Sequence, residues 1–87
     1  MQTTFDQYLE FPCAFNFRVM GLAEASLPDR VVAAIQAIVP GDYIPSHKPS
    51  RNGTYWSVSV TAQVPDKATV ETIYRALGQL DGVRMVL

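Results

Sequence analysis

The sequence predicts an α+β domain in which four antiparallel strands form one sheet and two helices cover a single face of that sheet. Three observations support this fold class. Apolar and polar residues alternate strictly over residues 55–64, which is the period of a strand with one buried face. Two other segments carry apolar residues at the spacing of an amphipathic helix. Turn-forming residues separate these segments into the order strand, helix, strand, strand, helix, strand.

An N-terminal arm, residues 1–13, is expected before the first strand. Pro12 stops any helix there, so we expect an irregular or briefly helical lid over one edge of the core. Cys13 is expected to be a small buried hydrophobe. The first strand is expected over residues 14–21, where Phe15, Phe17 and Val19 alternate with Asn16, Arg18 and Met20.

The first helix is expected to begin at Ser26. Ser26 and Asp29 have the spacing of a capping box, and Pro28 lies in the first turn, where its missing N–H costs nothing. Pro40 and Gly41 are expected to end the helix. Its apolar stripe would contain Val31, Val32, Ile35, Ile38 and Val39.

The second strand is expected over residues 43–49 and carries two prolines. Pro45 and Pro49 are four residues apart, so their missing N–H groups lie on the same lateral side of the strand. That side cannot donate to a neighbour, and the segment is therefore predicted to be an edge strand.

The turn after this strand contains Asn52-Gly53, which is typical of a two-residue hairpin turn. Such a turn would place Pro49 in a hydrogen-bonded pair with Trp56, where an N–H is needed. A four-residue loop closed by Ser50 and Tyr55 avoids this conflict and is the predicted connection. Both loops give the same opposed pairs, namely Lys48 with Ser57, Ser46 with Ser59 and Ile44 with Thr61.

Asp66 is the predicted N-cap of the second helix, and Asp81-Gly82 is predicted to end it. The buried stripe of this helix would contain Val70, Ile73, Tyr74, Leu77 and Leu80. The last strand is expected over residues 83–87. Strict alternation would place Val83, Met85 and Leu87 on the buried face and Arg84 and Val86 on the other face.

This order of elements predicts a ferredoxin-like βαββαβ sandwich with strand order 4-1-3-2. Right-handed crossovers would place both helices on one face of the sheet. The opposite face is then left open. It would carry Asn16, Arg18, Met20, Ser46, Lys48, Ser57, Ser59, Thr61, Arg84 and Val86.

The bulk composition excludes several classes of function. The chain has 87 residues, of which 48% are hydrophobic, so we expect a single globular domain spanning residues 1–87. The net charge of −1 lacks the positive excess that is typical of proteins that bind nucleic acid or an anionic membrane. One cysteine fits a reducing compartment, and no signal peptide or membrane-length apolar run is visible. We therefore expect a cytoplasmic protein.

No catalytic or metal-binding constellation is predicted. His47 is the only histidine, and Ser57, Ser59 and Asp42 are the side chains that could join it in a catalytic triad. The predicted register places His47 opposite Val58, on the core side, whereas both serines face outward. One histidine and one distant cysteine do not make a metal site, and the glycines form no phosphate-binding loop, so no cofactor is expected.

The open face offers the candidate binding residues. Arg18, Lys48 and Arg84 could form a cationic cluster around Ser57 and Ser59, which would hold a carboxylate or phosphate by charge-assisted hydrogen bonds. The alternative is an exposed sheet face that is polar only because it is solvated. Phe15, Phe17 and Trp56 are predicted to face the core and not the open face, where they would have to lie to stack on RNA bases. Nucleic acid is therefore not an expected partner.

Several short motifs resemble the YbeD-like family of small bacterial proteins, and together they extend over nearly the whole chain. They are Glu10-Phe11-Pro12, Arg18-Val19-Met20-Gly21, Pro40-Gly41-Asp42-Tyr43, Lys48-Pro49-Ser50 with Gly53, Tyr55, Ser57-Val58-Ser59 and Val83-Arg84-Met85-Val86-Leu87. The resemblance implies a fold similar to the ligand-binding ACT domain. It also implies a link to lipoate metabolism, because members often lie beside genes of lipoate attachment. It supplies no catalytic residues.

We therefore expect a non-enzymatic regulatory or adaptor domain that acts through its open face or a sheet edge on a protein partner. The alternative is an ACT-like domain that senses an amino acid or another small anion. The last strand is the free edge of the predicted sheet, since the prolines block the other edge. Pairing between two copies of that strand would give a weak homodimer.

Overall fold

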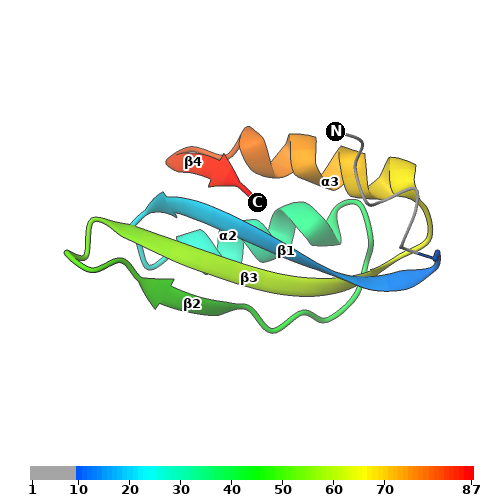
Figure 1. Cartoon of the computed structure of the whole chain (residues 1–87), viewed down its shortest axis with the longest axis horizontal. Coiled ribbons are helices and arrows are strands. Elements are labelled where there is room, and N and C mark those ends of the chain that lie inside the picture. The colour runs from blue at the N-terminus through cyan, green and yellow to red at the C-terminus, as the bar shows by residue number, and fades with distance from the viewer. Residues whose placement is uncertain (1–9) are drawn as a thin grey trace.

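The computed structural model describes residues 10–87, so most of the expected N-terminal arm lies outside the described residues. The predicted order of strands and helices is confirmed (Figure 1). The elements are β1 (Cys13–Leu22), α2 (Leu27–Gln36), β2 (Ser46–Pro49), β3 (Tyr55–Val64), α3 (Lys67–Gly78) and β4 (Val83–Val86). Cys13, which the sequence assigned to the arm, is the first residue of β1 and is half-buried against the core.

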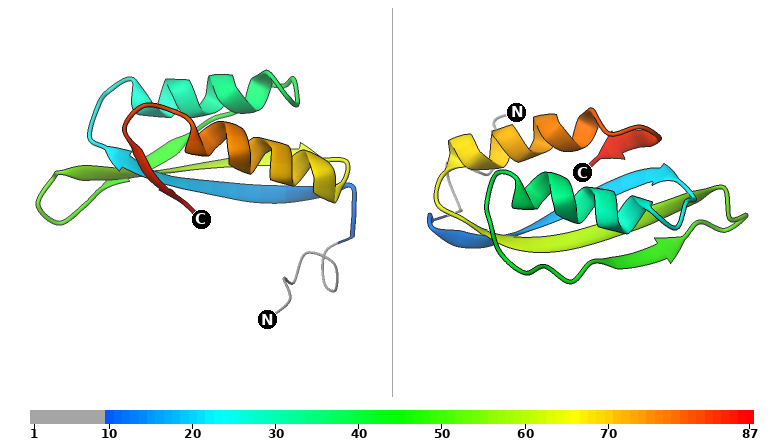
Figure 2. Two further views of the ribbon diagram at one scale, coloured as in Figure 1. Left: turned by 90° about the horizontal axis from the view of Figure 1, so that it is seen from above. Right: turned by 180° about the vertical axis from the view of Figure 1, so that it is seen from behind.

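The four strands form one antiparallel sheet in the order β2-β3-β1-β4, which is the predicted order read in reverse. Both helices lie on the same face of this sheet, and within residues 10–87 no helix covers the other, open face (Figure 2). The core between the sheet and the helices consists of Phe17, Val19, Leu27, Val31, Ile35, Val58, Val60, Ala62, Val64, Val70, Ile73 and Leu77. Neither helix among the described residues is long and apolar enough to cross a membrane.

The β2–β3 hairpin confirms the predicted edge strand and two of its three predicted pairs, and the third, Ile44 with Thr61, lies beyond the paired residues. β2 begins at Ser46, after Pro45, and is shorter than the predicted strand. Ser46 lies opposite Ser59 and Lys48 lies opposite Ser57. The Ser50 N–H donates to the Tyr55 carbonyl at 2.7 Å, and this hydrogen bond closes the predicted four-residue loop.

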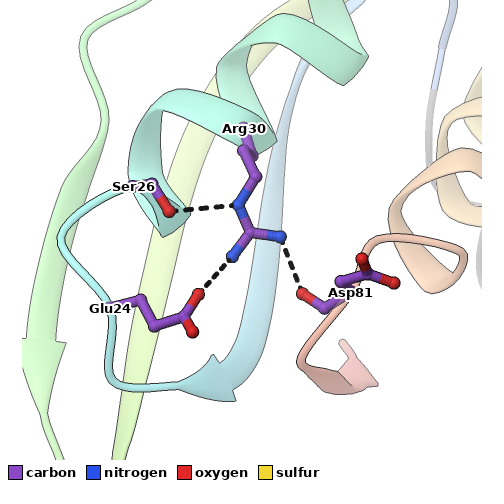
Figure 3. A network of polar contacts seen from close by, with 4 residues as sticks. All are labelled: Glu24, Ser26, Arg30 and Asp81. Atoms are coloured by element: carbon purple, nitrogen blue, oxygen red, sulfur yellow. Dashed lines mark hydrogen bonds and ion pairs between the residues drawn. The ribbon is translucent and has the colours of Figure 1, made fainter.

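The start of α2 differs from the predicted capping box. Ser26 has helical backbone angles and makes no side-chain cap, because its hydroxyl instead accepts a hydrogen bond from Arg30 Nε at 3.3 Å. The same guanidinium donates to Glu24 Oε1 at 3.0 Å and to the Asp81 carbonyl at 2.7 Å (Figure 3). Arg30 therefore ties the loop before α2 to the turn before β4.

The pairing of β4 corrects the predicted faces of the last strand. Val83 lies opposite Gly21 and Met85 lies opposite Met20, so Arg84 is an extra residue in a β-bulge. Beyond the bulge the alternation is inverted. Val86 lies opposite Val19 and packs against the core. Met85 and Leu87 were predicted to be buried, but their exposed fractions are 49% and 51%.

Gly21 allows β1 and the turn before β4 to approach closely at this irregularity. A Cβ atom at Gly21 would lie 3.0 Å from the Gly82 carbonyl oxygen and 3.2 Å from Leu27 Cδ2. Gly21→Ala is therefore expected to destabilise the domain by about 1–3 kcal/mol, measured by urea unfolding. Gly78→Ala is the matched control, since nothing lies within 4 Å of the added atom. Equal stability of Gly21→Ala and the wild type would contradict this close contact.

Asp66 caps α3 as predicted. Its carboxylate accepts hydrogen bonds from the Thr69 hydroxyl at 2.7 Å and the Thr69 N–H at 2.8 Å, and these bonds lower the pKa of Asp66 from its ordinary value of 3.8. A carboxyl with a lowered folded-state pKa stabilises the fold above its unfolded pKa and loses this effect as the pH falls through the folded value.

Asp66→Ala is accordingly expected to lower the melting temperature near neutral pH. The difference from the wild type should shrink as the pH falls from 3.8 through the lower folded-state pKa. Thermal melts over a pH series check this, with Asp42→Ala as a control at an exposed loop position. A destabilisation that stays constant down to the lowest pH would show that the ionised cap is not its cause.

Candidate functional site

Strand register arranges the open face in two rows of side chains that run across the sheet. The first row contains Ser46 on β2, Ser59 on β3 and Arg18 on β1. The second row contains Lys48 on β2, Ser57 on β3, Met20 on β1 and Met85 on β4. Because opposed residues in a sheet lie about 4.5–5.5 Å apart, side chains within a row are neighbours.

A shallow depression of about 320 Å³ lies between the two rows at the β2 side of the open face. We call it the basic depression. It contains four of the five binding residues predicted from the sequence. Its lining is Arg18, Ser46, His47, Lys48, Ser57 and Ser59.

Arg84, the fifth predicted residue, does not line the basic depression. It is the exposed extra residue of the bulge in β4, and β4 is separated from β3 by β1. The predicted cluster of three cations is therefore reduced to Arg18 and Lys48.

Both cations of the basic depression have free donor groups. Arg18 and Lys48 are exposed, and within residues 10–87 neither side chain forms an ion pair or a hydrogen bond. Arg30, in contrast, donates to three protein oxygen atoms. The guanidinium and ammonium groups beside Ser57 and Ser59 can therefore donate to an anion without breaking an internal contact.

His47 lies opposite Val58, as predicted, and is also among the residues that line the basic depression. The residue is exposed, and its ring stacks on Trp56 with a centroid distance of 4.3 Å and an interplanar angle of 19°. In the part of the chain that the structure describes, no hydrogen bond joins His47 to Ser57 or Ser59. Nor do three or more His, Cys, Asp or Glu side chains gather there as metal ligands.

A second, smaller hollow of about 100 Å³ adjoins the basic depression and shares Lys48 and Ser57 with it. Its other lining residues include Met20, Pro49, Tyr55 and Trp56. The predicted site did not include Tyr55, although its position two residues before Ser57 places it on the same side of β3. Period-two alternation alone could have found this residue.

The fold and the exposed face define a small ferredoxin-like α+β domain with a basic sheet surface. Solution structures of protein HP0495 from Helicobacter pylori share this fold. One aligns with a TM-score of 0.73 and 20% identity, covering 100% of this chain and 96% of that chain. Another aligns with a TM-score of 0.59 and 19% identity, covering 88% and 87%.

The chain belongs to the family described as "Protein of unknown function (DUF493)", which it matches over residues 6–87. A UPF0250 protein of Shewanella amazonensis is 52% identical over 87 residues, covering 100% of this chain and 99% of the relative. A UPF0250 protein of Idiomarina loihiensis is 49% identical over 86 residues, covering 99% and 98%. The resemblance to the YbeD-like family is thus confirmed.

Proposed function

We propose that this protein is a non-enzymatic regulatory or adaptor domain that binds an anionic group of a protein partner at the basic depression. The observation that supports this proposal is the pair of exposed cations, Arg18 and Lys48, with unused donors beside Ser57 and Ser59. Hydrogen bonds from a charged donor to a carboxylate or phosphate are about twice as strong as neutral ones.

The openness of the face favours a group presented on a protein surface. Sites for small molecules usually bury about 70–90% of the ligand surface. The basic depression lies on one face of a sheet, and its two cations are exposed, so it contacts a ligand from one side only. A carboxylate or phosphate on a protein partner would have its remaining sides covered by that partner.

Capture of partners from native cell extract tests this proposal. Three immobilised proteins are compared: the wild type, Arg18→Glu and Arg75→Glu. Arg75 is exposed on α3, so its reversal makes the same change in charge away from the open face. We expect a partner that the wild type and Arg75→Glu retain and that Arg18→Glu loses. The same bound proteins on all three would contradict a role for the open face.

The second candidate function is an ACT-like sensor of an amino acid or another small anion. The two adjoining hollows favour it, because they offer a basic and a less polar compartment side by side. Calorimetric titration with glutamate, lipoate, inorganic phosphate and ATP tests it. Lipoate is included because the family resemblance implies a link to lipoate metabolism. Saturable micromolar binding of one compound would favour the sensor, and its absence for all four would reject these ligands.

We also propose weak homodimerisation through β4, which is the edge of the sheet opposite the proline-marked β2. Two copies would pair their last strands and extend the sheet. Sedimentation velocity over a concentration series is expected to show a rising mean sedimentation coefficient. A strict monomer at the highest concentration would reject the dimer.

A further inference from the structure

The open face becomes more apolar from β2 toward β4, although Arg18 lies on β1. Its β2 and β3 side carries Lys48 and the serines of the basic depression. Its β1 and β4 side carries Met20 and Met85, opposed in the second row, and Leu87, whose N–H donates to the Arg18 carbonyl at 2.7 Å. We call Met20, Met85 and Leu87 the apolar strip.

The apolar strip is unusually exposed for this molecule. Within residues 10–87 the large hydrophobic residues with high exposure are Ile44, Met85 and Leu87, and two of these three belong to the strip. The β-bulge at Arg84 creates this exposure, because uninterrupted alternation would have buried Met85 and Leu87 and exposed Val86. Exposed apolar groups beside a polar rim often mark an interaction surface.

We infer that an acidic amphipathic helix of a partner protein docks on the open face. Its apolar side chains would lie over the apolar strip, and its carboxylates would reach Arg18 and Lys48. This inference rests on the proposed function and names the partner's chemistry. The charge on the site is positive and both cations lack internal partners, so an acidic segment is complementary to it.

The geometry of the sheet favours a helix over an extended segment. The face offers side chains and no free backbone groups, whereas an extended partner needs backbone hydrogen bonds, which only a sheet edge supplies. A helix satisfies its own backbone groups. Its diameter of about 10–12 Å is close to the roughly 14 Å spanned by four strands, so one helix can contact both the apolar strip and the cations. Methionine side chains adapt readily to different apolar partners.

A second copy of this chain is a poorer occupant of the open face. Face-to-face packing about a two-fold axis that runs across the strands would bring Arg18 and Lys48 toward the same cations of the other copy. Like charges brought together at an interface oppose binding. The complementary occupant is therefore an acidic partner.

A titration with designed peptides tests this inference. The probe is a synthetic helical peptide of about 14 residues, with leucines at i, i+3, i+7 and i+10 and glutamates on both flanks of that stripe. One control peptide replaces the glutamates with lysines, and the other replaces the leucines with serines. We expect the wild-type protein to bind the probe at least tenfold more tightly than either control. Amide shifts should concentrate at Arg18, Met20, Ser57 and Met85.

Variants of the protein distinguish the contribution of the apolar strip from that of the basic depression. Met85→Ser is expected to weaken probe binding about fivefold or more without changing the circular dichroism spectrum, because Met85 is already exposed. Gly78→Ala on α3 should bind like the wild type. Equal binding of the probe and the lysine peptide, or no binding of any peptide, would overturn the inference. If glutarate shifts Arg18 and Lys48 while no peptide binds, anion recognition stands and the helical partner is rejected.

Discussion

Replacing Phe17 with alanine is expected to remove a large part of the domain's stability. Phe17 lies in the middle of β1 and is fully buried. Its ring centroid is 4.8 Å from that of Phe15 and 5.7 Å from that of Tyr74, so it joins the sheet to α3. Truncating a buried phenylalanine typically costs about 3–5 kcal/mol. A chain of 87 residues is expected to have a total unfolding free energy of only about 4–13 kcal/mol.

Urea unfolding followed by circular dichroism measures this loss. Phe15→Ala is the matched control, because Phe15 lies on the same strand but is only half-buried. It should lose less stability than Phe17→Ala. Similar unfolding midpoints for Phe17→Ala and the wild type would show that this ring does not hold the sheet to α3.

Reversing both cations of the basic depression is expected to abolish recognition of an acidic partner. The variant is Arg18→Glu with Lys48→Glu, and both positions are exposed, so the fold should persist. Losing about 1.4 kcal/mol at each position would weaken binding about tenfold for each, or about 100-fold together. Repulsion between the new carboxylates and the acidic ligand should increase the loss.

The affinity for the acidic helical peptide measures this effect. Arg51→Glu with Arg75→Glu is the matched double variant: both residues are exposed, lie outside the lining of the basic depression, and change the net charge by the same amount. It should retain most of the affinity. Equal losses in the two double variants would mean that binding responds to net charge and not to the basic depression.

The parts of the fold that follow from local chemistry could be predicted from the sequence. Pro45, just before β2, and Pro49, its last residue, predicted an edge strand, and the conflict at Pro49 selected the loop closed by Ser50 and Tyr55. That loop set the register that brings Lys48 and Ser57 together. Four of the five predicted binding residues line one depression for this reason.

The parts that depend on distant contacts could not be predicted in this way. The bulge in β4 arises where Gly21 lies against the Gly82 carbonyl, and local periodicity carries no information about such a contact. One extra residue inverts the faces of all residues that follow it, which moved Met85 and Leu87 to the open face. The side chain of Arg30 likewise engages Ser26, and this contact replaces the predicted cap.

An amide-shift titration with glutarate tests the central claim most directly. This small dicarboxylate carries the anionic group that the basic depression is proposed to bind, and Arg18 and Lys48 both line that depression. We expect saturable shifts concentrated at Arg18, Lys48, Ser57 and Ser59, and their loss in Arg18→Gln with Lys48→Gln. Shifts scattered over both faces of the domain, or unchanged in that double variant, would contradict anion binding at the basic depression.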